Sequence, residues 1–173
     1  MIESIQVKLR LTSSDSIALP LTNPNCVKVD LGCGDRKRQI PPGFIGIDNY
    51  KYPGVDIVRD VDKHGLPFGD CTIDFIFASH FMEHVNNLIF VMEEIWRVLK
   101  RKGILEMINP LWTSKYAYAH PDHKRLIHPD LWSWWLPSAD NRDREAYGVK
   151  ARFEVLKNFV QGEGLFTTLM AVK

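Results

Sequence analysis

Two glycines and two aspartates stand where consecutive predicted strands end, the place at which α/β proteins bind ligands. Residues 29–35 read VDLGCGD and place Gly32 and Gly34 in a turn after an apolar run. Glycine in such a turn lets a ligand approach the backbone without interference from a Cβ atom. Asp48 ends the second predicted strand and Asp60 the third. Carboxylates there can accept hydrogen bonds from ribose hydroxyls or an adenine amino group.

The glycine turn lacks parts of two common phosphate-binding motifs. Gly34 is followed by the sequence DRKR, so the third glycine of GxGxxG is missing, and GxxxxGK[ST] is also absent. Both absences disfavour a pyrophosphate site. Asp30, Asp48 and Asp60 could each be an ordinary turn acid. Their recurrence at successive strand ends, around a GxG turn, favours a binding site instead.

Histidines supply the candidate acid–base groups, because imidazole titrates near neutral pH. His80 and His84 follow the strand predicted at 73–78, and their four-residue spacing would place both on one helix face. Either could act as a general base towards an acceptor. The alternative for His84 is a purely structural role in capping or packing the helix.

A polar and aromatic segment at 111–150 contains two His-Pro-Asp units, which begin at His120 and His128. His120 and His123 are further catalytic candidates, and turns held by hydrogen bonds are the alternative. A metal site built from His120, Asp122, His123 and His128 is a third interpretation. The prolines disfavour the helical spacing that would fix such ligands, so we predict no metal ion. LWSWWL (131–136) is either an aromatic platform for an acceptor or a patch that packs on the core or a dimer partner.

Hydrophobic patterning shows which elements must position these residues. Residues 5–11 alternate apolar and polar positions and, with a second short strand expected at 17–21, predict an N-terminal β extension over residues 1–25. Residues 88–100 have the apolar periodicity of a helix, and we expect Gly103 to close it. Residues 26–173 form the main domain, an open, doubly wound α/β sheet whose last two strands are an antiparallel hairpin. Its predicted strands are 26–31, 44–49, 55–61, 73–78, 104–110, 153–161 and 166–173.

Length and composition exclude several classes of protein. The 173 residues fit one domain, and 45% hydrophobic with 25% charged residues is near the globular average. A formal charge of +1 disfavours a nucleic-acid partner. Three cysteines without a CxxC pair argue against disulfides and thiolate zinc sites. Without an apolar run of about 20 residues or a leader, we expect a cytoplasmic monomer or homodimer with no membrane contact.

The ordered motifs resemble those of class I S-adenosylmethionine-dependent methyltransferases, in particular small type-11 domains. The matching stretches are VDLGCG (29–34), GIDN (46–49), IVRDV (57–61), 66–85 and 93–110. The resemblance implies a seven-stranded Rossmann-like sheet, S-adenosylmethionine as cofactor and 111–150 as an acceptor-binding insertion. It also implies cofactor contacts: the methionine part at Asp30, Gly32, Cys33 and Gly34; the adenosine at Asp48, Asn49, Asp60 and Val61; and the sulfonium near Ala78, Ser79 and His80.

The expected reaction is an in-line methyl transfer to a small-molecule or sugar-precursor acceptor. Only thirteen residues separate Gly34 from Asp48, and they include Pro41-Pro42-Gly43. The family's first helix must therefore be very short or missing. This shortening keeps open a non-catalytic S-adenosylmethionine sensor or partner subunit. A nicotinamide oxidoreductase is a further alternative, which the missing third glycine disfavours.

Overall fold

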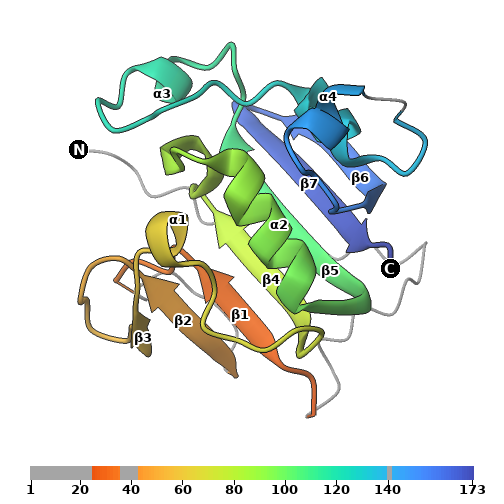
Figure 1. The fold of residues 1–173 in the computed structure, drawn as a ribbon. Coiled ribbons are helices and arrows are strands. Elements are labelled where there is room, and N and C mark those ends of the chain that lie inside the picture. Colours follow the sequence, from red (N-terminus) through yellow and green to blue (C-terminus); the bar gives the residue numbers. More distant parts are fainter. Residues whose placement is uncertain (1–24, 36–42, 140–141) are drawn as a thin grey trace, which may run out of the picture.

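A seven-stranded mixed sheet forms the centre of the protein, in the order β3-β2-β1-β4-β5-β7-β6 (Figure 1). The computed structural model describes residues 25–35, 43–139 and 142–173. The N-terminal β extension predicted at 1–25 therefore lies almost wholly outside the described residues, as does most of the shortened connection after Gly34. The strands are β1 (Lys28–Leu31), β2 (Phe44–Asp48), β3 (Ile57–Val58), β4 (Ile73–Ser79), β5 (Leu99–Pro110), β6 (Phe153–Gln161) and β7 (Gly164–Ala171).

Strand directions follow the predicted class. β1 pairs in parallel with both β2 and β4, and β3 and β5 extend the parallel part on either side. β7 pairs antiparallel with β5 and β6. The doubly wound α/β prediction and its closing hairpin are confirmed. The sheet reverses its winding beside β1 and β4, so a crevice is expected at the carboxyl ends of these strands.

Short helices and one longer helix connect the strands. α2 carries its buried residues at spacings of three and four, and in Figure 1 it lies across the sheet in front of β4 and β5. Asn87 caps its N-terminus by accepting a hydrogen bond from Phe90 N. No described helix is long and apolar enough to cross a membrane. The helices are α1 (Val61–His64), η2 (Met82–His84), α2 (Leu88–Val98), α3 (Lys115–Tyr118), η3 (Pro129–Trp135) and α4 (Arg142–Ala146).

Two local predictions were wrong. α2 ends at Val98, and Gly103 lies inside β5 rather than at a helix end. A Cβ at position 103 would lie 2.9 Å from the Lys100 carbonyl oxygen, so this sharp bend of the strand requires glycine. The third strand is only Ile57–Val58 instead of 55–61, because Asp60 caps α1 and the chain turns away from the sheet.

The aromatic run 131–136 belongs to the core. Trp132 and Trp135 are each 1% exposed and pack within the main hydrophobic cluster, together with residues of α2 and β7. These two rings are therefore not an acceptor platform. Their burial fixes η3 against the sheet and so anchors the segment that follows β5.

Candidate functional site

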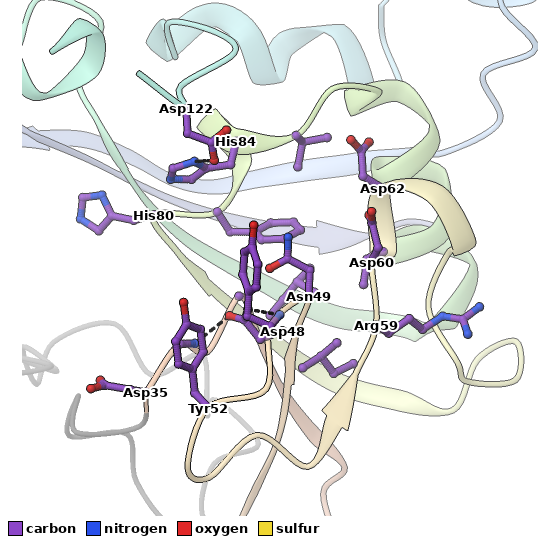
Figure 2. Close-up of a pocket in the computed structure, with 18 residues that line it drawn as sticks. Asp35, Asp48, Asn49, Tyr52, Arg59, Asp60, Asp62, His80, His84 and Asp122 are labelled. Carbon is purple, nitrogen blue, oxygen red and sulfur yellow. Dashed lines mark hydrogen bonds and ion pairs between the residues drawn. The ribbon is translucent and has the colours of Figure 1, made fainter. Parts of the chain in front are cut away.

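A cavity of about 490 Å³ opens at the carboxyl ends of β1, β2 and β4 (Figure 2). Its size falls within the usual range of small-ligand sites, about 300–1,000 Å³. The turns after these strands and the start of α1 provide most of its wall. Nine of the residues singled out from the sequence line it: Gly32, Gly34, Asp48, Asn49, Asp60, Val61, His80, His84 and Asp122.

Four other predicted cofactor residues do not line this cavity. Asp30 and Cys33 are each 2% exposed, Ala78 is fully buried, and Ser79 ends β4. Asp30 lies within β1, where its backbone pairs with Gly46 and Phe77. None of the four is among the residues that line the cavity, so their roles towards a cofactor stay predictions.

The glycine turn is held tightly against the end of β2. Gly32 N and Cys33 N both donate to the Ile47 carbonyl oxygen, at 2.9 and 3.1 Å. Gly32 has a φ of +71°, and a Cβ there would lie 2.7 Å from Cδ2 of Phe81. A substituted residue would therefore be strained and would clash with the Phe81 ring. Among the described residues, none has an atom within 4 Å of the Cβ position of Gly34, so these residues leave space beside the turn.

Asp48 joins the turns that follow β1 and β2. Its Oδ2 accepts a 2.9 Å hydrogen bond from Gly34 N, and its Oδ1 accepts one of 3.0 Å from Tyr50 N. The two bonds orient the carboxylate at the cavity, and each oxygen keeps a further lone pair for a ligand hydroxyl. This arrangement suits the predicted contact with a ribose.

Asp60 and Val61 lie at the start of α1. Asp60 accepts a 3.3 Å hydrogen bond from Lys63 N and forms a 2.8 Å ion pair with Lys63 Nζ. It is thus the N-cap of α1 as well as a wall of the cavity, so the turn-acid interpretation and the binding-site interpretation both apply to it.

His80 stands on a strained turn directly after β4. Its φ is +53°, and its backbone N donates to the Ile108 carbonyl oxygen at 2.8 Å. Its Nδ1 lies 3.1 Å from Oε1 of Glu83, which is fully buried, while the His80 ring is about half exposed. A carboxylate can only accept, so Nδ1 carries the proton and Nε2 keeps a lone pair.

Sequence reasoning did not assign roles to several residues of this cavity. Glu83, which does not line the cavity but contacts His80, also had no assigned role, although an acid three residues after His80 was a signal for an oriented pair. Tyr50 and Tyr52 are exposed, line the cavity and have ring centroids 6.1 Å apart. Asp62 completes the acidic part of the wall together with Asp122, which the sequence had named only as a metal-ligand alternative. Both tyrosines follow Asp48 closely, but nothing in the sequence distinguishes them from ordinary loop residues.

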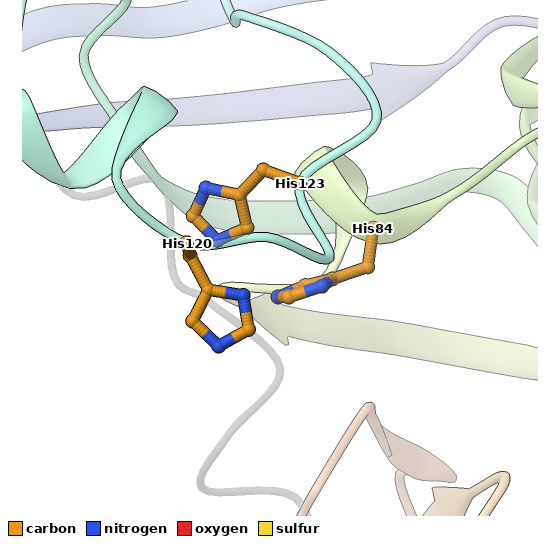
Figure 3. Close-up of side chains that lie close together, drawn as sticks. All are labelled: His84, His120 and His123. Atoms are coloured by element: carbon orange, nitrogen blue, oxygen red, sulfur yellow. The ribbon is translucent and has the colours of Figure 1, made fainter.

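The two His-Pro-Asp units lie in different surroundings. His120 and His123 meet His84, with their ring nitrogens within 4.8 Å of one another (Figure 3). His128 instead caps η3 and contacts Trp112 at a ring-centroid distance of 5.4 Å. Three of the four histidines named as catalytic candidates thus form one cluster, and His80 forms a separate pair with Glu83.

Comparisons of the sequence with known proteins find methyltransferases. Residues 39–107 match the family model of a methyltransferase domain. Sterol 4-C-methyltransferase strm-1 of Caenorhabditis elegans is 29% identical over 104 residues, which are 57% of this chain and 31% of the relative. 24-Methylenesterol C-methyltransferase 2 of Oryza sativa subsp. japonica is 32% identical over 93 residues, 53% of this chain and 26% of the relative. The chain thus spans less than a third of the full length of either relative.

Solved structures share the fold at low identity. A SAM-dependent methyltransferase from Aquifex aeolicus has a TM-score of 0.56 at 17% identity, covering 92% of this chain and 94% of its own. The trans-methyltransferase CalH, solved with SAH, has a TM-score of 0.57 at 15% identity, covering 90% of this chain and 53% of its own. With the strand order, and with the GxG turn and Asp48 at one cavity, the family match over residues 39–107 supports a class I S-adenosylmethionine-dependent methyltransferase domain, and the solved structures share its Rossmann-like fold.

Proposed function

We propose that this chain binds S-adenosylmethionine in the cavity and transfers its methyl group to a small-molecule acceptor. The observation that carries the proposal is the hydrogen bond from Gly34 N to Asp48 Oδ2, 2.9 Å long. It brings the glycine turn and the ribose-binding candidate together at one cavity wall. The same residues in separate places would support neither a nucleoside site nor the family's chemistry.

The cavity suggests an orientation for the cofactor. The ribose would contact Asp48, and the adenine would lie between Asn49 and the start of α1 at Asp60 and Val61. The open space beside Gly34 suits the methionine end. The exposed rings of Tyr50 and Tyr52 can close over the adenosine by stacking. The sulfonium end then faces the turn at His80.

Methyl transfer needs alignment and, for a hydroxyl or amine acceptor, a base. The sulfonium supplies an activated methyl group, whose carbon–sulfur bond breaks with both electrons passing to sulfur. His80 is placed to accept the acceptor's proton at Nε2, while Glu83 holds the ring through Nδ1. Holding both reactants in line is the larger contribution, up to about 7–11 kcal/mol.

We assign the acceptor to small molecules with an oxygen or nitrogen nucleophile, such as a sugar precursor. The pairing of His80 with buried Glu83 supports this assignment, because proton removal matters for such nucleophiles. A transfer assay with a labelled methyl group would compare sugars, amines and sterols as acceptors. Methylation of a sterol and of no sugar or amine would contradict this acceptor class.

Calorimetric titration tests the cofactor site. S-adenosylmethionine and S-adenosylhomocysteine should bind, and NAD should not. Asp48→Ala should weaken binding about tenfold to a hundredfold, since a hydrogen bond to a charged group is worth about 1.5–3 kcal/mol. Asp48→Asn is the matched control. Its cofactor affinity should lie between those of the wild type and Asp48→Ala, because the amide keeps one acceptor oxygen. Unchanged affinity in Asp48→Ala would remove the ribose assignment. Cofactor binding without transfer to any acceptor would favour the sensor alternative.

A further inference from the structure

Three histidines from two distant segments form a cluster beside the cofactor cavity (Figure 3). His84 ends η2, while His120 and His123 belong to the loop after α3. The His120 and His123 rings are stacked with centroids 4.8 Å apart, and His84 stands nearly perpendicular to His123 at 4.7 Å. The proposed methyl transfer uses none of these rings.

Backbone contacts hold the two segments together. Lys124 N donates to the Glu83 carbonyl oxygen at 2.7 Å. The Arg125 guanidinium donates through Nη2 to the carbonyl oxygens of Val85 and Asn86, at 2.6 and 2.8 Å. The residues that form these bonds are within two positions of His84 or His123 in the sequence. The three rings therefore meet because hydrogen bonds to the backbone hold the loop after α3 against η2 and the residues that follow it.

Two of the rings have their protons fixed in a way that suits a metal ligand. His123 Nδ1 lies 2.9 Å from the Ala117 carbonyl oxygen, and His84 Nδ1 lies 3.1 Å from Oδ2 of Asp122. Both acceptors require a proton on Nδ1, which leaves the lone pair on Nε2. A carboxylate or carbonyl behind a ligating imidazole is the usual outer shell of a metal site.

We propose that His84, His120 and His123 bind a Zn²⁺ ion, with Asp122 as the group that orients His84. Imidazole nitrogen suits zinc, whereas magnesium and calcium prefer oxygen ligands. Zinc–nitrogen bonds of about 2.0–2.1 Å place tetrahedral ligand atoms about 3.3 Å apart. The observed nitrogens lie within 4.8 Å, and exposed His120 would close the difference by rotating out of the 3.2 Å hydrogen bond that its Nδ1 accepts from Asp122 N.

Three protein ligands leave a fourth position for water or substrate, as in catalytic zinc sites. His84 and Asp122 both line the cofactor cavity, so the ion would lie at its wall. An acceptor hydroxyl bound there would lose its proton more readily. Zinc binding itself does not depend on methyl transfer, but this effect on the acceptor rests on the function proposed above.

Metal titration of the untagged chain, freed of metal with a chelator, tests the site. We expect one Zn²⁺ per chain by calorimetry and elemental analysis, and a visible spectrum of tetrahedral Co²⁺ on substitution. His84→Ala and His123→Ala should each weaken zinc binding by more than a hundredfold. Asp122→Asn should weaken it about tenfold to a hundredfold, the usual cost of losing an outer-shell partner. His64→Ala and His128→Ala remove histidines outside the cluster and should leave zinc affinity unchanged.

Two results would overturn the site: no stoichiometric zinc at micromolar concentrations, or equal zinc affinity in His84→Ala, His123→Ala and the wild type. Circular dichroism shows whether each variant is folded. For a folded chain, zinc should raise the unfolding temperature of the wild type and of His64→Ala, but not of His84→Ala. S-adenosylmethionine titrations with and without zinc separate this proposal from the previous one, since either ligand can bind when the other does not.

Discussion

At the scale of single residues, the pairing of His80 with Glu83 has the clearest chemical consequence. Glu83 is fully buried and reaches His80 Nδ1 at 3.1 Å, so it would position the base proposed above. The sequence indicated His80 through its place after β4. It could not indicate the direction of the ring, which depends on the left-handed turn at His80 and on the carboxylate beneath it.

Glu83→Gln should lower kcat about tenfold to a hundredfold for a hydroxyl or amine acceptor and leave KM nearly unchanged. The expectation follows because the amide holds the imidazole less firmly, and a positioned base contributes about 10²–10⁴-fold. Steady-state kinetics at several pH values, with cofactor affinity measured in parallel, would check this. His80→Asn is the control that removes the base and tolerates the positive φ. Equal kcat in wild type and Glu83→Gln would show that Glu83 does not position a base.

The grouping of the histidines could not be predicted from the sequence. The sequence grouped His120 and His123 with His128, because the two His-Pro-Asp units look alike. The structure joins His120 and His123 to His84 instead, through the backbone bond from Lys124 to Glu83. That contact links segments about forty residues apart, and no local pattern encodes it.

At the scale of elements, α1 and α2 are connected by one carboxylate. Asp62 accepts hydrogen bonds of 2.8, 2.7 and 2.8 Å from Asn86 N, Asn86 Nδ2 and Asn87 N. Partial burial alone would raise the pKa of Asp62, but the bonds from Asn87 and Asn86 outweigh burial and lower it. Asn87 is also the N-cap of α2, so Asp62 fixes the point at which the longest helix begins.

Asp62→Ala should reduce the free energy of unfolding at pH 7 by about 1–2 kcal/mol, after allowance for solvent screening. A carboxylate whose pKa is lower in the folded state stabilises above its unfolded pKa of about 4 and loses that effect as pH falls through the folded value. The gap between wild type and variant should therefore shrink below pH 4. Urea unfolding at a series of pH values measures it, with Asp62→Asn as the isosteric control. A gap that grows on acidification would contradict this account.

Most elements could be predicted because their apolar patterns are strong. The runs at 73–78 and 153–161 became β4 and β6 almost residue for residue. The errors occurred where polar contacts override the pattern. Asp60 caps α1 where the third strand was expected to continue, and β5 already begins at Leu99, before Gly103. Both depend on local backbone geometry that hydrophobic periodicity does not report.

At the scale of the whole molecule, a ligand that bridges the turns after β1 and β2 should stabilise the entire sheet. S-adenosylhomocysteine at about a hundred times its Kd should add about 2.7 kcal/mol to the free energy of unfolding. For a chain of this size that corresponds to a Tm increase of about 5–10 °C. Differential scanning fluorimetry measures the shift. NAD should produce none, and Asp48→Ala should lose most of it; an equal shift with NAD would favour the oxidoreductase alternative.

The order of the last three strands has a consequence for protein synthesis. β7 follows β6 in the chain but lies between β5 and β6, pairing with both. While a ribosome is still making residues 164–171, β6 has already been made without its neighbour, and the growing sheet ends at an open β5. Exposed strand edges invite pairing between chains. Nascent chains that stall or terminate before Gly164 should therefore be the species most dependent on chaperones.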